Sequence, residues 1–192
     1  MALKNATLKK WLICGAAFCA AFNAAAQNAE ARATVPLPFY NLHTKQAMVI
    51  HHASGKAVSK EINDFMRDHR RNEPANMDSR LFDLLVDLKA AIEKRHPHIK
   101  VKFETISAYR APQTNEMLRS KGGSQATQSR HMHGDAIDIR VPGLTTKELR
   151  DIATCLRRGG VGYYAADGFV HVDIDRVRYW PSHDYLATLK CK

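Results

Sequence analysis

Cysteine is scarce in this chain, which has only four cysteines among 192 residues. Cys14 and Cys19 lie in an apolar N-terminal run, and Cys155 and Cys191 are far apart in the sequence. This spacing excludes a cysteine cluster of the kind that binds a structural metal ion. If the first pair is removed with a secretory signal, the second pair can form one disulfide or remain two free thiols. The sequence leaves both alternatives open.

Apolar runs long enough to span a membrane are also lacking. The apolar run at residues 11–27 is short for a transmembrane helix, and it follows a segment with three lysines and no acidic residue. A basic segment followed by a short apolar run is typical of a secretory signal peptide, and Ala24–Ala26 provides a cleavage site of small residues. A second cleavage site at Ala31–Ala33 and an uncleaved N-terminal anchor are the alternatives.

These features predict a signal peptide at residues 1–26, a loose leader at residues 27–36 and one domain at residues 37–192. We expect export to the periplasm or cell envelope, with no stable membrane span after cleavage. Removing the three lysines would lower the formal net charge from +10 to +7, which still favours anionic partners such as cell-wall polymers. Nucleic acid is excluded as a partner by export and by basic residues that are scattered without interleaved aromatics.

Helical and strand-like patterns alternate along the expected domain. Apolar residues at helical spacing predict four helices. They are expected at residues 54–70, from a cap at Asp78 or Ser79 to the segment RHPHIK at residues 95–100, from Pro112 to Arg119, and from a capping box of Thr145 and Glu148 to Leu156. Alternating patterns predict strands at residues 101–110, 135–141, 161–164 and 168–175, and a hairpin at residues 38–52. The fold class is therefore α+β, with a small, largely antiparallel sheet on which helices pack.

The stretch SRHMHGDAIDIRVPG, residues 129–143, concentrates polar side chains just before and within a predicted strand. In that strand Asp138 lies on the face opposite Ile137 and Ile139. If the strand that carries His171 is its neighbour, then His131, Asp138 and His171 can converge. Two imidazoles and one carboxylate suit Zn²⁺ and leave a fourth position for water. The alternative is that these histidines are ordinary hydrogen-bonded residues of two strands.

The segment SRHMHGDAID fits the motif S-x-H-x-x-G-x-A-x-D, and SAYR, residues 107–110, fits S-[GA]-Y-R. Both resemble motifs of zinc D-Ala-D-Ala carboxypeptidases, of dipeptidases and of their relatives with the hedgehog-type metallopeptidase fold. The segments NLHT, EINDFMRDHR and GGVGYY…GFVHVDIDRVRYW are most similar to the murein endopeptidase K family, so the resemblance covers residues 37–181. It implies a hedgehog-type or D-Ala-D-Ala-peptidase-like fold and an exported enzyme that cuts peptidoglycan cross-links.

The resemblance also implies roles for individual residues. His131, Asp138 and His171 match the ligands of one Zn²⁺ ion. The third ligand departs from the commoner patterns, because a Glu-x-x-His register would put the catalytic base at Gly168, and a His-x-His register would make Asp173 the ligand and His171 the base. We prefer His171 as the ligand, and Asp173 is then the candidate base or a group that supports the ligand.

Arg110 matches the family arginine that contacts the substrate and the developing oxyanion, and the alternative is a structural salt bridge. Tyr109 and Trp180 are candidates for lining a peptide groove, although aromatic residues more often lie in the core. His133 and Asp135 fall at variable positions of the motif, so we expect His133 at the rim of the site or in solvent and Asp135 at the surface.

The resemblance favours a zinc-dependent murein endopeptidase, a hydrolase of peptidoglycan stem-peptide cross-links. A D,D- or L,D-carboxypeptidase acting on the same polymer is the alternative within the enzyme class. A non-catalytic cell-wall-binding module that retains the zinc site is the alternative outside it. The residues do not determine which cross-link is cut or the oligomeric state.

Overall fold

Seven strands form one sheet in the part of the chain that this computed structural model describes, residues 34–181, 186 and 188–191. The strand order is β2-β1-β3-β4-β6-β5-β7. The strands are β1 (Val35–Asn41), β2 (Ala47–His52), β3 (Phe103–Ser107), β4 (Ala136–Arg140), β5 (Gly160–Tyr164), β6 (Phe169–Asp173) and β7 (Arg178–Trp180). Strand β1 begins two residues before the expected start of the domain. The predicted signal peptide, residues 1–26, lies outside the described residues.

The sheet is mixed but mostly antiparallel. The pairs β1–β2, β3–β4, β4–β6 and β5–β6 are antiparallel, whereas β1–β3 and β5–β7 are parallel. The expectation of an α+β fold with a largely antiparallel sheet is confirmed. The two parallel pairs and strand β7 were not predicted, because alternation along one strand does not identify its neighbours. The relation to hedgehog-type folds stays a prediction.

In the described stretch at residues 34–181, four α-helices and one short 3₁₀ helix connect the strands. They are α2 (Lys60–Phe65), α3 (Ser79–Arg95), α4 (Pro112–Ser120), η1 (Arg130–His133) and α5 (Thr146–Leu156). Three of the predicted helix starts are confirmed: of the two expected caps it is the Asp78 side chain that caps α3, Pro112 occupies the first turn of α4, and Thr145 with Glu148 forms a capping box at α5. Helix α2 is much shorter than the expected residues 54–70.

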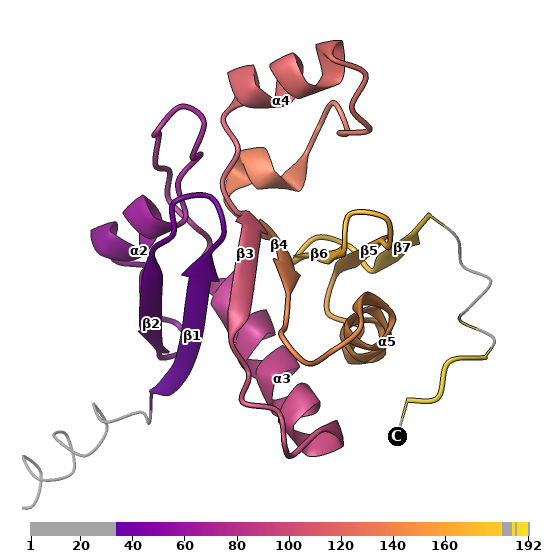
Figure 1. The fold of residues 1–192 in the computed structure, drawn as a ribbon. Helices are drawn as coiled ribbons and strands as arrows, with labels where there is room; N and C mark the ends of the chain where they lie inside the picture. Colours follow the sequence, from indigo (N-terminus) through magenta and orange to yellow (C-terminus); the bar gives the residue numbers. More distant parts are fainter. Residues whose placement is uncertain (1–33, 182–185, 187, 192) are drawn as a thin grey trace, which may run out of the picture. The chain divides into compact units, whose positions relative to one another are not determined.

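The hydrophobic core lies between the sheet and the two long helices. Helices α3 and α5 contact each other, and in Figure 1 both are seen next to the strands. Their apolar residues join the inward-facing residues of β4 and β6 in one buried cluster, which includes Leu81, Leu85, Leu88, Ile92, Leu149, Ile152, Ile137, Ile139, Val170 and Val172. Because strand residues alternate between faces, this burial directs Asp138 and His171 to the other face of the sheet.

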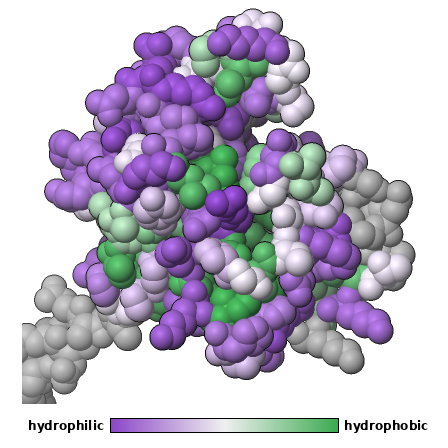
Figure 2. Space-filling view, in the orientation of Figure 1, coloured by the Kyte–Doolittle hydropathy of each residue, from purple (hydrophilic) through white to green (hydrophobic). Residues whose placement is uncertain are grey.

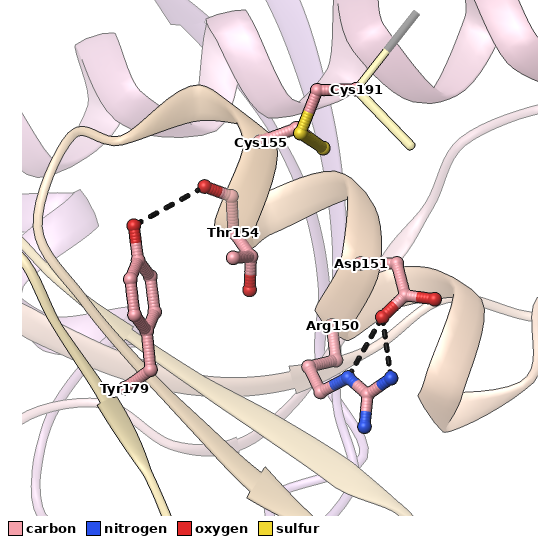
Figure 3. Close-up of a disulfide and its surroundings, with 6 residues drawn as sticks. All are labelled: Arg150, Asp151, Thr154, Cys155, Tyr179 and Cys191. Carbon is pink, nitrogen blue, oxygen red and sulfur yellow. Dashed lines mark hydrogen bonds and ion pairs between the residues drawn. A yellow bond between two sulfur atoms is a disulfide. The ribbon is translucent and has the colours of Figure 1, made fainter. Parts of the chain in front are cut away.

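A disulfide joins Cys155 of α5 to Cys191 near the C-terminus, with 5.4 Å between their Cα atoms (Figure 3). Of the two alternatives left by the sequence, the structure therefore contains the disulfide. Helix α5 ends at Leu156, where Arg157 adopts a left-handed conformation, and not at the two glycines that follow. Figure 3 also shows the Tyr179 hydroxyl donating to the Thr154 carbonyl over 3.5 Å, which links β7 to the same helix.

The described surface is predominantly polar on the face seen in Figure 2, where hydrophobic residues appear only as small patches. Only two large hydrophobic residues are exposed among the described residues, Val49 and Val177. None of the described helices combines the length and the apolar character needed to cross a membrane.

Candidate metal centre

His131, Asp138 and His171 come together in space as their spacing predicted. Asp138 in β4 lies directly opposite His171 in β6, and η1 carries His131 to the start of β4. The Nε2 atom of His131 is 3.2 Å from Asp138 Oδ1 and 3.0 Å from His171 Nδ1, and those two atoms are 2.9 Å apart. The three side chains are buried. One nitrogen or oxygen atom from each residue therefore forms a compact triangle.

Hydrogen bonds on the far side of each imidazole determine which nitrogen faces this triangle. His131 Nδ1 lies 2.6 Å from the Ala108 carbonyl oxygen, which can only accept, so Nδ1 carries the proton. His171 Nε2 lies 2.9 Å from the Asp173 carboxylate and donates to it in the same way. In the neutral imidazoles, two nitrogen lone pairs and a carboxylate oxygen then point at one another. Such an arrangement requires a proton or a cation between them.

The donor set fits a zinc ion. Tetrahedral Zn²⁺ with bonds of about 2.0–2.1 Å to nitrogen and oxygen places its ligand atoms about 3.3 Å apart, close to the separations in this triangle. Three protein ligands leave one coordination position free, as in catalytic zinc sites. Each histidine also donates its second N–H to a carbonyl or carboxylate, the usual support of a zinc-bound imidazole. The role of these residues as ligands stays a prediction.

The surroundings hold Asp138 and His131 in the protonation states that a metal needs, whereas they favour the protonated form of His171. Burial opposes ionisation of Asp138, but the charge and hydrogen bonds of His131 and His171 outweigh it and bring the pKa of the carboxyl well below its usual range. Burial lowers the pKa of His131, so this imidazole is neutral at neutral pH. For His171, burial is outweighed by hydrogen bonds to Asp138 and Asp173, and its pKa is raised. Metal binding would then displace a proton from His171.

Asp173 lies behind His171 and not in the cavity wall. Its side chain is fully buried, and its Oδ2 accepts hydrogen bonds from His171 Nε2 and from Arg178, at 2.9 Å and 2.7 Å. Its Oδ1 accepts from the backbone N–H groups of Gly160 and Asp175, both at 3.0 Å. Because both oxygens are occupied, the geometry does not support the prediction of Asp173 as a catalytic base. It matches the alternative, a group that orients His171.

Arg110 follows β3 and reaches the triangle from the side. Its Nη2 atom is 3.5 Å from Asp138 Oδ2, the carboxylate oxygen that lies outside the triangle. The turn that carries Arg110 is fixed by Asp68, whose buried carboxylate accepts the Ala111 N–H at 2.9 Å. Arg110 therefore forms the ion pair considered as its structural alternative, and it also borders the cavity described next, while its contact with the substrate stays a prediction.

A cavity of about 570 Å³ opens onto the three converging residues. One part of its wall is the segment from Ser124 to Arg130, and another is aromatic, formed by Tyr163, Tyr164, Phe169 and Trp180. Trp180 lines this cavity, and its expected contact with a peptide stays a prediction. Tyr109 is absent from the described wall and packs against the hydrophobic core, which was the alternative considered for it, and its role in substrate binding stays a prediction. Only its neighbour Arg110 reaches the cavity, a difference that the SAYR motif does not reveal.

The two polar residues beside the motif histidine have different surroundings. His133 is exposed, as expected, and is not part of the triangle. Asp135 was expected at the surface but is buried, so that expectation is wrong. Arg130 forms an ion pair with its carboxylate, and the Asp135 carbonyl accepts the Ile174 N–H at 3.2 Å. The ion pair offsets the cost of burying the charge.

Several residues that shape the site were not identified from the sequence. Tyr164 and Arg178 lie within the segments that resemble the murein endopeptidase K family, but no role was assigned to either. Arg178 and Trp180 are two residues apart in β7, which was too short to be predicted as a strand. Asp68 lies in the segment EINDFMRDHR, beyond the end of α2, and accepts a hydrogen bond from a residue 43 positions later in the chain. Only the pairing of β7 with β5 brings Arg178 to Asp173.

Comparison with known proteins identifies the family of the chain. Residues 28–180 match the family model described as peptidoglycan L,D-endopeptidase MepK. The peptidoglycan L,D-endopeptidase MepK of Escherichia coli is 34% identical over 148 residues, which cover 75% of this chain and 79% of that protein. The probable peptidoglycan L,D-endopeptidase MepK of Haemophilus influenzae is also 34% identical over 148 residues, covering 75% and 77% of the two chains. The chain therefore belongs to the MepK family of murein endopeptidases.

Proposed function

We propose that this chain is an exported, zinc-dependent peptidase that hydrolyses peptide cross-links in peptidoglycan. Membership of the MepK family supports the reaction class and the polymer. The observation that carries the zinc dependence is the buried triangle of His131, Asp138 and His171, with 2.9–3.2 Å between its donor atoms. Because the similar proteins are described as L,D-endopeptidases, the bond that we propose is one between an L- and a D-centre.

Zinc would be held by His131 Nε2, Asp138 Oδ1 and His171 Nδ1, and when bound it supplies Lewis-acid chemistry for amide hydrolysis. The residues behind the ligands keep the donor atoms directed at the site. The Ala108 carbonyl fixes the ring of His131, and the Asp173 carboxylate fixes the ring of His171. Asp173 is therefore proposed as an orienting residue and not as a base.

Arg110 is proposed to bind the substrate and the oxyanion that develops at the scissile carbonyl. Its guanidinium is largely buried, and its Nε atom has no hydrogen-bond partner among the described residues. A charged donor in a partly desolvated wall stabilises negative charge more strongly than the same group in water. Peptidoglycan stem peptides also carry carboxylates, which a guanidinium can bind through two hydrogen bonds.

Export is proposed on three grounds. The N-terminal segment has the composition of a signal peptide, and peptidoglycan lies outside the cytoplasm. The disulfide between Cys155 and Cys191 suits an oxidising compartment. The net positive charge of the chain favours a polymer rich in carboxylates.

The test is digestion of intact cross-linked sacculi and of purified muropeptide dimers, with the products identified by mass spectrometry. We expect dimers to be converted to monomers, cleavage to stop after treatment with a chelator, and cleavage to return when zinc is added. The His131→Ala variant should lose both bound zinc and activity. His133→Ala is the matched control, because His133 is an exposed histidine of the same helix η1 and should leave both unchanged.

The possible outcomes separate the alternatives. Release of terminal D-alanine without loss of cross-links would identify a carboxypeptidase. Binding of sacculi without any product would identify a non-catalytic module. Cleavage that survives complete removal of divalent metal would contradict the zinc dependence.

A further inference from the structure

Tyr164, at the end of β5, lines the same cavity as Arg110 and the proposed zinc ligands. Its ring stacks on Phe169 with 4.5 Å between centroids and an interplanar angle of 15°. The indole Nε1 of Trp180 donates a hydrogen bond to the Tyr164 hydroxyl oxygen over 3.0 Å. Two contacts thus fix the position of the hydroxyl, one through the ring and one through the oxygen.

The hydrogen bond from Trp180 has a consequence for the proton of Tyr164. An indole N–H can only donate, so the tyrosine oxygen must act as the acceptor and its own proton stays available. No acceptor for that proton is found among the described residues 34–181, 186 and 188–191. Burial raises the pKa of Tyr164, so the hydroxyl is protonated at neutral pH. Tyr164 therefore holds an uncommitted donor in the cavity wall.

Trp180 is itself held in place from several sides. In the sheet, Gly162 of β5 is paired with His171 of β6 on one side and with Trp180 of β7 on the other. A Cβ atom at Gly162 would lie only 2.5 Å from the indole ring, so the ring packs directly against the strand backbone. The Arg178 guanidinium lies 5.3 Å from the indole centroid, and the His171 ring centroid is 5.1 Å from that of the indole. The direction of the indole N–H is therefore set by the sheet.

We propose that the Tyr164 hydroxyl donates a hydrogen bond to an oxygen of the bound stem peptide, a peptide carbonyl or a carboxylate, and that Trp180 positions it. The proposal rests on the proposed function, which brings a peptide into this cavity. Such a peptide offers many acceptor oxygens, and Tyr164 supplies a neutral donor in addition to the charged Arg110. Tyr164 is thus a substrate-contacting residue, and Trp180 acts through it.

The first test is Tyr164→Phe, which removes only the hydroxyl and keeps the ring that stacks on Phe169. Loss of one neutral hydrogen bond should lower kcat/KM for a muropeptide dimer by about 3- to 10-fold. The dissociation constant of chelator-treated protein for the same dimer, measured by calorimetry, should rise by a similar factor. Zinc content and Tm should match those of the wild type. The matched control is Tyr40→Phe, which removes the same atom on β1, outside the described cavity wall.

The second test asks whether Trp180 acts through the hydroxyl. Trp180→Phe removes the indole N–H, and it should weaken dimer binding in the wild-type background. In the Tyr164→Phe background the same change should have a smaller effect, because the hydroxyl to be positioned is absent. Equal effects of Trp180→Phe in the two backgrounds would overturn the positioning role.

The failure of this inference is distinguishable from failure of the proposed function. If the wild type cleaves dimers and Tyr164→Phe binds and cleaves them equally well, the proposed contact does not exist. If Tyr164→Phe loses zinc or melts at a lower temperature in parallel with its activity, the hydroxyl has a structural role and the proposal is overturned. If the wild type does not cleave dimers at all, it is the proposed function that fails.

Discussion

His171 donates its Nε2 proton to the Asp173 carboxylate over 2.9 Å, and this hydrogen bond leaves Nδ1 facing Asp138 and His131. The carboxylate is in turn held by Arg178 and by backbone N–H groups. An ionised acceptor behind an imidazole makes the opposite nitrogen a better ligand and fixes the ring orientation. This hydrogen bond supports the role proposed for Asp173, orienting the His171 ring, which needs no contact with the substrate.

Asp173→Asn should weaken zinc binding, because the amide keeps the shape of the side chain but loses its charge. Removal of such an outer partner usually costs about 10- to 100-fold in metal affinity. The measurement is a competition titration against a chromophoric chelator at fixed pH. Asp175→Asn is the control, because the Asp175 side chain also contacts Arg178 but does not contact His171. Unchanged zinc affinity combined with lost turnover would instead restore Asp173 as a proton-transfer group.

The convergence of His131, Asp138 and His171 could be predicted from the sequence because it depends mainly on which face of a strand each residue occupies. Alternation along a strand places Asp138 opposite its apolar neighbours, and the same rule applies to His171. The additional requirement was that these strands be adjacent, which β4 and β6 are. The burial of Asp135 could not be predicted in this way, because it depends on whether Arg130 turns back toward it. Motif position alone does not contain that information.

The same contrast holds for the fold. Helix caps are local, so the sequence narrowed the cap of α3 to Asp78 or Ser79, and Asp78 is the one that caps it. Strand β7 has three residues and is stabilised by pairing with β5, and no local pattern marks it. Of the aromatic wall, only Trp180 was considered from the sequence, and its contact with Tyr164 was missed because the two residues meet when β7 joins the sheet.

His69 should make the stability of the protein depend on pH between about 4 and 6.5. Its ring stacks on that of His43, with 3.8 Å between the ring centroids. Burial, together with the charges of His43 and Arg70, lowers the pKa of His69 to about 4. In this range the unfolded chain binds more protons at this position than the folded chain, so stability rises with pH and is lost as the pH falls. Tm measured against pH in zinc-free protein should show this slope.

The control variants separate His69 from the carboxylates that titrate at lower pH. His69→Phe keeps a stacked ring but cannot take up a proton, so Tm should change less between pH 4 and 6.5 than in the wild type. His98→Phe changes an exposed histidine and should leave the wild-type slope in place. An unchanged slope in His69→Phe would show that another group is responsible.

The disulfide should contribute substantially to stability, because it closes a loop between residues 36 positions apart. Loop-closure entropy predicts about 3–4 kcal/mol for a loop of this length, and measured values commonly fall between about 2 and 5 kcal/mol. The variant with both Cys155→Ser and Cys191→Ser should unfold at a correspondingly lower concentration of urea. Wild-type protein treated with a reductant is the control and should reach the same midpoint. A loss below about 0.5 kcal/mol would contradict the expected contribution.

Gly162→Ala should displace Trp180, because the added methyl group would lie 2.5 Å from atoms of the indole ring. Overpacking of this kind costs about 1–3 kcal/mol and moves the larger partner. Trp180 is the only tryptophan outside the predicted signal peptide, so in protein purified without residues 1–26 its emission spectrum reports the displacement directly.

A rescue experiment distinguishes this clash from a general intolerance of side chains in β5. In the Trp180→Phe background the smaller ring leaves room for the methyl group, so Gly162→Ala should cost less free energy of unfolding than in the wild type. If the costs in the two backgrounds are equal, then the glycine is needed for some reason other than the indole. A reduced cost, combined with a shifted emission maximum in Gly162→Ala, would mean that this glycine sets the direction of the indole N–H and hence the position of the Tyr164 hydroxyl.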